Sequence, residues 1–451
     1  MIPDSRSANT MTPPPLDVGG SRELFLDDFL LDGSRDLSFA VHSPTELPAD
    51  PGKPNGAYCT ILHDGKQFRY YYRGFDGVWT GKQLNGNPGE FTAVALSDDG
   101  IRWHQPEWSL RRGEGLPAGT IFHGNGFAHN FIPFLDTDPA CPPEERYKAV
   151  AGVRETHGLF AFCSPDGIHW RHYDETSPVI PYEPAKCGGH LLDSQNAVFY
   201  SECEQCYVMY PRVWKTADGF DHLRSFAKTT STDFRHWSEM EFLHVNRPGE
   251  HLYVSGLRPY PRAPHYYIGA ATRYFEERGS ATDVVLLFSR RGQGIGRPSS
   301  AAWIRPGLDP DRWSNRCNYI AWGMVQASPE ELILYHGPRR LMYKLRTDGF
   351  VSLSAGINEG TMTTRILSRK SGGDLSLNLS TSAGGSFAIE VTSPDGNPVP
   401  GFSFADFPAF YGDRIAFTPE WKNGKHFSEL PPGDFRLRVR MTECDLYSIS
   451  F

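Results

Sequence analysis

The sequence predicts an all-β protein, a five-bladed β-propeller followed by a small β-sandwich. The main observation is a recurring frame that ends an apolar run, makes a turn and, in its three clearest copies, continues to a tryptophan. These copies occupy residues 97–103, 164–170 and 231–237, and weaker copies occupy residues 289–292 and 346–350. Their first residues lie 67, 67, 58 and 57 positions apart (164−97, 231−164, 289−231 and 346−289). Five turns at nearly constant spacing indicate five copies of one supersecondary unit.

Each copy has the same internal order of predicted strands. The turn itself, with Asp99-Gly100 and Asp166-Gly167 as its clearest examples, is typical of a β-hairpin because glycine accepts a positive φ. First strands with polar residues near their start are expected at 58–62, 129–134, 193–200, 253–257 and 319–326. Aromatic second strands follow at 68–73, 147–153, 207–213, 266–271 and 332–336. Third strands lead into the repeated turn at 91–96, 159–163, 225–230, 284–288 and 341–345. With a short fourth strand after each turn, the unit is a propeller blade.

The two ends of the chain lie outside this period. Residues 1–22 are expected to be extended or disordered, and the apolar run 23–31 is predicted to be a strand that completes the ring, giving a propeller over 23–355. Closure of this kind hides the last exposed sheet edge. After residue 356 the composition shifts to Ser, Thr and Gly, with alternating polar and apolar residues at 375–379 and 387–391. Such alternation indicates strands with one solvated face, and residues 356–451 are therefore expected to form the β-sandwich.

Composition and charge exclude several classes of function. The chain of 451 residues has a net charge of −8 and no basic run, so no nucleic-acid partner is expected. No apolar run approaches the roughly 18 residues of a membrane span, and no membrane partner is expected. The first 20 residues lack the apolar core of a signal peptide, which predicts a cytoplasmic protein, or an exported one whose leader is absent from this sequence.

The cysteines predict neither a disulfide framework nor a metal centre. Eight of them are scattered along a large chain, which favours reduced thiols. Cys203 and Cys206 form the only close pair, and a zinc site would need a second pair at a suitable spacing. We expect no metal and no cofactor.

Candidate site residues follow from the propeller geometry. The first strand of each blade lines the central channel, so residues that open these strands converge on one funnel. Amide, imidazole and guanidinium groups there suit the hydroxyls of a sugar. The predicted substrate-binding residues are Asn55, Tyr58, His129, Asn130, Gln195, Asn196, His251, Arg258, Arg273, Arg316 and His336. Structural roles remain open for several of them: a buried donor for His129 and His336, and an ion pair between blades for Arg273.

Two carboxyl groups are the predicted catalytic pair. Asp193 opens the third blade and is the predicted general acid, since partial burial raises the pKa of a carboxyl group and allows it to protonate a leaving oxygen. Glu250 opens the fourth blade and is the predicted base or nucleophile. The alternatives are that Asp193 caps its strand or pairs with an arginine, and that Glu250 is a solvated turn residue.

Several segments resemble a known family. These are Leu24-Phe25-Leu26-Asp27-Asp28, His129-Asn130-Phe131, the run from Pro142 to Ala149, Asp193-Ser194-Gln195-Asn196 and Asp445-Leu446-Tyr447-Ser448. Together with five blades and a sandwich, they resemble the five-bladed glycoside hydrolases of families 32 and 43 and a group of bacterial proteins of the same architecture. The resemblance implies cleavage of a furanoside-type or related oligosaccharide by a pair of carboxylates.

The sequence also departs from that family. The family places an aspartate at the opening of blade one, where this chain has Pro54-Asn55-Gly56-Ala57-Tyr58, and the opening of blade two has His129-Asn130 instead of a second aspartate. Only Asp193 occupies an expected acidic position. The missing aspartate favours a second hypothesis, a non-catalytic propeller that binds carbohydrate or another protein. The polar funnel and Asp193 favour the enzyme.

Overall fold

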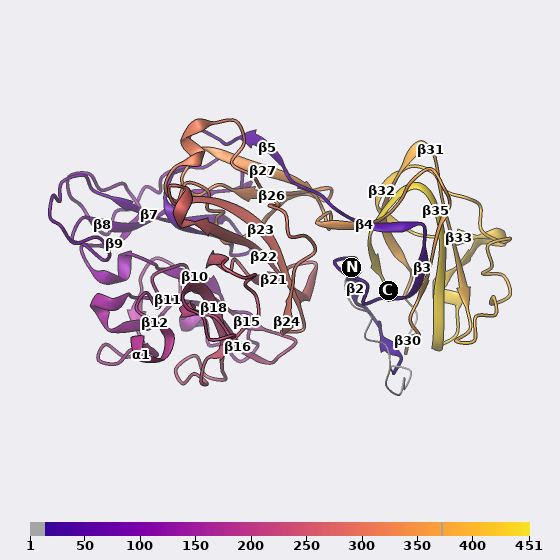
Figure 1. The fold of residues 1–451 in the computed structure, drawn as a ribbon, viewed down its shortest axis with the longest axis horizontal. Coiled ribbons are helices and arrows are strands. Elements are labelled where there is room, and N and C mark those ends of the chain that lie inside the picture. The colour runs from indigo at the N-terminus through magenta and orange to yellow at the C-terminus, as the bar shows by residue number, and fades with distance from the viewer. Residues whose placement is uncertain (1–13, 371–372) are drawn as a thin grey trace. The chain divides into compact units, whose positions relative to one another are not determined.

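The computed structural model describes residues 14–370 and 373–451, which form two compact units (Figure 1). One unit comprises residues 41–347, and the other joins the N-terminal segment up to residue 40 to residues 348–451. Nearly all regular structure is β. Among the described residues, the only α-helix is the short α1 (Pro184–Cys187). No helix in this part of the chain is long and apolar enough to cross a membrane.

Residues 41–347 form the predicted five-bladed propeller. The first blade contains β6 (Ala57–His63), β7 (Phe68–Phe75), β8 (Glu90–Ser97) and β9 (Thr120–His123). The second contains β10 (Ile132–Leu135), β11 (Tyr147–Ala151), β12 (Gly158–Ser164), β13 (Arg171–His172) and β14 (Ile180–Pro181). The third contains β15 (Ala197–Ser201), β16 (Cys206–Tyr210), β17 (Arg212–Lys215), β18 (Asp221–Ser231) and β19 (Glu241–Phe242). The first strands β6, β10 and β15 lie side by side, as they do around a propeller axis.

The last two blades complete the ring. The fourth contains β20 (His251–Val254), β21 (Arg258–Tyr260), β22 (Ala263–Phe275), β23 (Ala281–Arg290) and β24 (Gln293–Gly296). The fifth contains β25 (Val325–Ser328), β26 (Glu331–Tyr335), β27 (Leu341–Arg346) and β5 (Thr45–Pro48). The ring closes where Thr60 of the first blade pairs with Trp322, which precedes β25. Short 3-10 helices interrupt the loops of both units: η1 (Gly126–Ala128), η2 (Pro143–Glu145), η3 (Arg154–Thr156), η4 (Glu276–Arg278), η5 (Pro310–Trp313), η6 (Lys422–Gly424) and η7 (Phe427–Glu429).

The ring-closing strand differs from the prediction. The outer strand of the fifth blade is β5, which pairs antiparallel with β27 from Thr45↔Lys344 to Pro48↔Leu341. The predicted closing segment contributes β2 (Arg22–Leu24) to the second unit instead, where it pairs with β35 (Gly433–Ser450). Residues 43–54 are rich in proline, but proline is tolerated at the end of an edge strand because it leaves the rest of the ladder intact. The boundaries therefore lie at 40/41 and 347/348 rather than 22/23 and 355/356.

The repeated turn lies in the same place in every blade, directly after the third strand. In two copies the Ser hydroxyl accepts a hydrogen bond from the glycine N–H, at 2.9 Å for Ser97–Gly100 and 2.9 Å for Ser164–Gly167. The Gly167 carbonyl also accepts a hydrogen bond from Tyr71 Oη of the preceding blade at 3.0 Å. The repeat thus marks the contact between neighbouring blades as well as the hairpin.

This contact predicts a large effect of Gly167→Ala on stability. Gly167 has φ +71°, and a Cβ there would lie 2.6 Å from Tyr71 Oη. Gly65→Ala is the matched control, because Gly65 has φ +91° and open space around the same position. Backbone strain is common to both variants. The free energy of unfolding is therefore expected to fall by about 1–3 kcal/mol more in Gly167→Ala than in Gly65→Ala, which is the usual cost of overpacking. Urea unfolding followed by tryptophan fluorescence measures the difference, and equal losses would contradict a blade contact at this turn.

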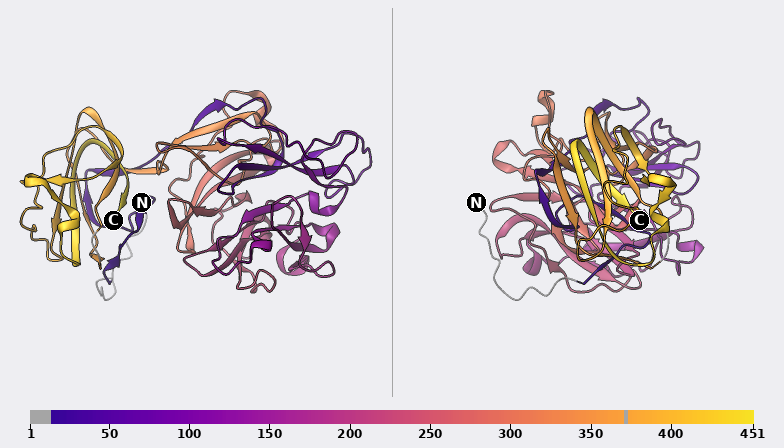
Figure 2. Two further views of the ribbon diagram at one scale, coloured as in Figure 1. Left: turned by 180° about the vertical axis from the view of Figure 1, so that it is seen from behind. Right: turned by 90° about the vertical axis from the view of Figure 1, so that its right-hand side faces the viewer.

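The second unit is the predicted β-sandwich, built around one apolar core that includes Phe25, Leu377 and Leu437. Its long strands β31 (Ser376–Thr392) and β35 pair with each other and are drawn in orange and yellow in Figure 2. The remaining strands are β1 (Leu16–Asp17), β2, β3 (Leu31–Arg35), β4 (Leu37–Val41), β28 (Val351–Ala355), β29 (Gly360–Thr364), β30 (Leu367–Arg369), β32 (Asp413–Phe417), β33 (Glu420–Trp421) and β34 (Lys425–His426). Of the N-terminal segment predicted to be extended or disordered, residues 1–13 lie outside the described residues, and β1 pairs with β30. All eight cysteines are free thiols.

Candidate active site

One end of the propeller collects polar side chains from all five blades, and we call it the site end. Strand direction alternates within a blade, so the start of the first strand, the end of the second and the start of the third share this end. The register shows it in blade one, where Ala57 pairs with Arg73 and Phe75 with Glu90. The repeated Asp-Gly turns occupy the opposite end. The site end is therefore built from three positions per blade rather than one.

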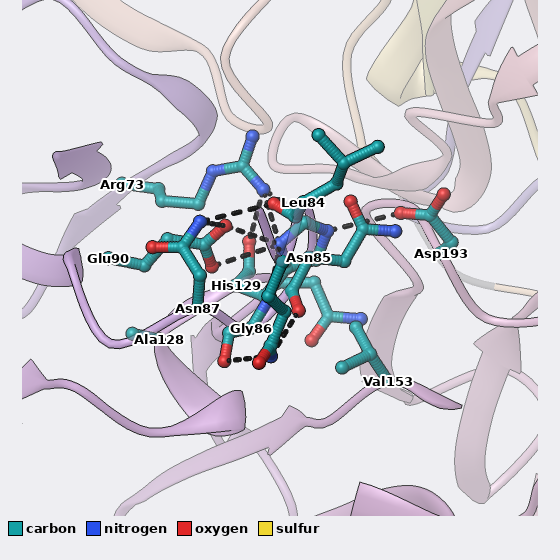
Figure 3. Close-up of polar contacts among 12 residues, drawn as sticks. Arg73, Leu84, Asn85, Gly86, Asn87, Glu90, Ala128, His129, Val153 and Asp193 are labelled. Carbon is teal, nitrogen blue, oxygen red and sulfur yellow. Dashed lines mark hydrogen bonds and ion pairs between the residues drawn. The ribbon is translucent and has the colours of Figure 1, made fainter. Parts of the chain in front are cut away.

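A histidine between two carboxylates is the centre of this end (Figure 3). His129 Nδ1 lies 3.0 Å from Glu90 Oε2, and His129 Nε2 lies 3.1 Å from Asp193 Oδ1. Glu90 and His129 are almost fully buried. The guanidinium of Arg73 contacts the same imidazole and donates a hydrogen bond to the His129 carbonyl at 3.1 Å. Blades one, two and three thus meet in one chain of polar contacts that holds Asp193.

Asp193 is ionised in this setting. Burial disfavours its charge, but the hydrogen bond from His129 and the positive charges of Arg212 and Arg73 outweigh burial and hold its pKa well below the usual range. Arg212 Nη1 also donates a hydrogen bond to the Asp193 carbonyl at 2.5 Å. The Asp193 side chain keeps 22% of its surface exposed. An ionised carboxylate has no proton to give, so this setting favours a role for Asp193 as base or nucleophile over the predicted role as general acid.

Three residues of the site end have strained backbone. Tyr58, Leu192 and Arg316 have φ of 49°, 64° and 55°, in the left-handed region that side chains other than glycine seldom adopt. Each such residue costs about 1–3 kcal/mol, and strain of this kind is concentrated at functional sites. The three residues come from blade one, from the opening of blade three and from the loop that enters blade five, so the strain marks the same end that the polar contacts mark.

Arginines stacked on aromatic rings surround Asp193. The Cζ atom of Arg73 lies 4.8 Å from the centre of the Tyr58 ring, and that of Arg212 lies 4.5 Å from the Tyr253 ring. Arg224 and Arg316 lie against Tyr274 at 4.1 and 5.8 Å. Burial, followed by neighbouring acidic groups, raises the pKa of Tyr58 and Tyr319 well above the usual value. Both phenols are therefore neutral hydrogen-bond donors.

Glu250 does not join this cluster. Its carboxylate makes a bidentate ion pair with Arg297, with distances of 3.0 and 2.9 Å, and lies 3.7 Å from Arg273 Nη1. Only 8% of its side chain is exposed. Arg273 in turn pairs with Asp283 at 2.7 Å. This corrects both predictions: Glu250 and Arg273 belong to an ion-pair network within blade four, because Arg297 follows β24 and returns to the strand opening in a way that sequence spacing does not reveal.

Glu250→Gln is accordingly expected to weaken the fold and spare the chemistry. Removal of one partner from a buried ion pair costs about 3–5 kcal/mol, since Arg297 is left without its carboxylate. We expect a loss of this order in urea unfolding, with kcat and KM per folded molecule unchanged. A fall in kcat at full stability would restore Glu250 to the catalytic machinery.

Most of the other predicted binding residues have structural roles. Asn130 and Asn196 donate hydrogen bonds to the Leu192 carbonyl at 3.0 Å each, and Gln195 bonds the Cys59 carbonyl at 2.8 Å. His336 is fully buried, and burial, with help from nearby cations such as Arg312, holds its pKa well below the usual value. Asn130, Asn196 and Gln195 satisfy backbone groups where first strands begin, which explains the polar strand openings without a ligand.

Arg258 lies at the opposite end of the channel. It stacks on Trp322 at 5.0 Å and lines a cavity of about 310 Å³ with the ends of the first strands. Burial lowers its pKa to about 10. Asn55 is exposed beside the start of β6, and its predicted binding role stays a prediction. Tyr58, His129, Asp193, His251 and Arg316 are the predicted residues that the structure leaves around Asp193 at the site end, apart from the ion-pair network of Glu250 and Arg273.

Sequence reasoning missed residues that lie at the end of a second strand or near the start of a third. In blade one these are Arg73 and Glu90, and in blade three Arg212 and Arg224. The signal was available, because each position follows from the same strand order once the first-strand openings are placed at one end. Among the described residues, no group of three or more His, Cys, Asp or Glu side chains is arranged to hold a metal ion.

Comparison with known proteins relates this architecture to solved structures only. No family model matches the chain, and no curated protein matches it. A structure titled glycoside hydrolase matches with 13% identity and a TM-score of 0.43, covering 69% of this chain and 91% of that one. The chain is similar in fold to glycoside hydrolases. A thermostable family-43 glycoside hydrolase (10% identity, 68% and 96% covered, TM-score 0.44) and a fructofuranosidase from Schwanniomyces occidentalis (11%, 92% and 98%, 0.40) are further examples.

Proposed function

We propose that this protein is a glycoside hydrolase in which the Asp193 carboxylate acts as base or nucleophile. The observation that carries the proposal is the setting of Asp193: ionised, partly exposed and fixed by His129, which Glu90 holds from the other side. A nucleophilic or basic carboxylate needs to stay charged at the working pH and to hold one orientation. Aromatic rings and guanidinium groups around it suit the faces and hydroxyls of a sugar.

Glycosidic cleavage needs a second carboxyl group, and Glu276 is the candidate that replaces Glu250. It lies in η4 at the site end of blade four, 3.8 Å from Arg224 Nη1 and 4.0 Å from His251 Nε2. Its side chain is 59% exposed. An exposed carboxyl on a hairpin can approach a leaving group once substrate is bound. Glu276→Gln should slow substrates with poor leaving groups far more than aryl glycosides, which need little protonation.

The alternative is a sugar-binding propeller without catalysis. One observation favours it: Glu276, the candidate second carboxyl group, already contacts the side chains of Arg224 and His251, as a purely structural residue would. In this case the site end would bind sugar, and Asp193 would be a hydrogen-bond acceptor for hydroxyls.

A substrate screen with a matched variant separates the two functions. Aryl glycosides and plant or algal oligosaccharides are incubated with the wild-type chain and with Asp193→Asn, and both release of product and binding are measured. Turnover by the wild type that Asp193→Asn loses while it still binds the sugar supports the hydrolase. Binding by both proteins with no turnover of any glycoside establishes the binding propeller and overturns the hydrolase.

A further inference from the structure

Guanidinium groups outnumber carboxylates in the cluster around His129 and Asp193, counted apart from the ion-pair network of Glu250 in blade four. Among the described residues gathered there, four guanidinium groups (Arg73, Arg212, Arg224 and Arg316) meet three carboxylates (Asp193, Glu90 and Glu276). Glu90 is held by His129, and Glu276 lies 3.8 Å from Arg224. Within the described part of the chain, neither Arg212 nor Arg316 has a side-chain carboxylate within ion-pair distance. Arg212 acts on Asp193 through its charge without direct ion-pair contact, and Arg316, which stacks on the Tyr253 ring, has no carboxylate partner among the residues described.

Several buried polar atoms at the same place also have no hydrogen-bond partner among the described residues. They are Arg73 Nε, Arg212 Nε, Arg224 Nε and Tyr319 Oη. Arg212, Arg224 and Tyr319 are only 2%, 5% and 7% exposed. Buried donors without acceptors are rare in folded proteins because each carries a desolvation cost. The three Nε atoms can only donate, and the Tyr319 hydroxyl can donate as well. The missing partner is therefore an acceptor, and beside guanidinium groups the favoured acceptor is an anion.

We infer that the substrate is an anionic glycoside, one whose sugar carries a carboxylate or a sulfate group. The inference rests on the proposed function and narrows its substrate class. Guanidinium groups bind such oxyanions through paired, charge-assisted hydrogen bonds. Stacking on Tyr253 fixes the orientation of the Arg212 guanidinium group and excludes water from one of its faces. Both effects strengthen the attraction between this guanidinium group and an oxyanion of the substrate.

The position of Arg212 also places the anionic group along the substrate. Arg212 donates a hydrogen bond to the Asp193 carbonyl at 2.5 Å, and Arg316 lies against the same Tyr253 ring, with its Cζ 5.6 Å from the ring centre. The charged substituent therefore belongs to the sugar that is bound at Asp193 rather than to a distant residue of an oligosaccharide. A neutral sugar in the same position would leave Arg316 without a carboxylate or other anion to pair with.

Binding to Asp193→Asn tests the inference without turnover. Calorimetry compares methyl glucuronide and methyl galacturonide with the neutral methyl glucoside and methyl galactoside, and galactose 6-sulfate forms a separate arm that distinguishes sulfate from carboxylate. We expect at least one anionic sugar to bind roughly tenfold or more tightly than its neutral counterpart, the effect of one charged hydrogen bond. The preference should shrink with added salt.

Arg316→Gln supplies the decisive variant, because Arg316 is exposed and its removal leaves the buried contacts in place. It should lose roughly tenfold in affinity for the anionic sugar and keep its affinity for the neutral one. Arg235→Gln is the control: Arg235 also stacks on a tyrosine, Tyr173 at 4.7 Å, but follows a repeated turn at the opposite end. It should change neither affinity.

The outcomes separate this inference from the proposed function. Equal affinity for neutral and anionic sugars, or no binding of any anionic sugar in the panel, overturns the inference even if the wild type hydrolyses neutral glycosides. Anion-dependent binding that Arg316→Gln removes, with no hydrolysis of any glycoside by the wild type, upholds the inference and overturns the hydrolase.

Discussion

Asp193→Asn is expected to lower kcat/KM by about 10²–10⁴, the range for removal of a general base, and by more if Asp193 is the nucleophile. Asparagine keeps the shape and still accepts a hydrogen bond from His129 Nε2, which lies 3.1 Å from Asp193 Oδ1 in the native protein. The fold should therefore persist, and substrate affinity should change little. Steady-state kinetics on an aryl glycoside measures the loss. A base or a nucleophile acts regardless of the leaving group. Asp193→Asn should therefore slow substrates with good leaving groups and substrates with poor ones by a similar factor.

The pH dependence of the wild type checks the same assignment. His129, Arg212 and Arg73 hold the pKa of Asp193 well below its usual range, so Asp193 stays charged from neutral pH down past about 4, the ordinary pKa of an aspartate. Protonation of Asp193 should then cause no loss of rate between about pH 7 and pH 4. By the same linkage, Asp193 stabilises the fold above its unfolded pKa, and this contribution is lost as the pH falls toward its folded pKa.

Two results would contradict this assignment. One is an aryl-glycoside rate that Asp193→Asn leaves intact. The other is an acid limb near about pH 5–6 that is present in the wild type and that carboxylate-specific labelling assigns to Asp193. Chemical rescue adds a positive test, since azide should restore turnover to Asp193→Ala by occupying the space of the missing carboxylate.

The fold was predictable because it is repeated. Five turns at similar intervals define five blades whatever the details of each strand, and the turn residues Ser164 and Gly167 make the local hydrogen bonds that the hairpin requires. Ring closure was not predictable in this way. A single short strand such as Thr45–Pro48 pairs through its backbone, and backbone pairing leaves little trace in the order of polar and apolar residues.

The site was predictable only in part, for a physical reason. Polar residues at a strand opening serve either a ligand or the backbone, and sequence does not distinguish Asp193, which is partly exposed, from Asn196, which bonds the Leu192 carbonyl. Charge partners from distant strands decide the role. The ion pair with Arg297 engages Glu250, so Glu250 is not available as a catalytic residue. The hydrogen bond from His129 and the charge of Arg212 lower the pKa of Asp193, so its side chain is a carboxylate and not the predicted acid.

A large loss of stability is also expected from His129→Ala. Glu90 is fully buried, and without His129 its only remaining side-chain contact among the described residues is with Asn87 Nδ2 at 3.4 Å. A buried carboxylate that loses its partner costs about 3–5 kcal/mol. Urea unfolding followed by tryptophan fluorescence is a suitable measurement because nine of the ten tryptophans lie within residues 41–347.

The double variant His129→Ala/Glu90→Gln shows whether charge is the cause. A neutral glutamine removes the buried charge, so the double variant should be more stable than His129→Ala alone, although it carries one more substitution. A loss that stays the same or grows would mean that His129 stabilises the blades by packing, as its ring contact with Tyr58 at 5.9 Å allows. In both variants Asp193 loses the hydrogen bond that His129 supplies, so the pKa of Asp193 should rise. Activity, if any remains, should then fall on acidification at a higher pH than in the wild type, which would tie the Glu90–His129 pair to the state of the reacting carboxylate.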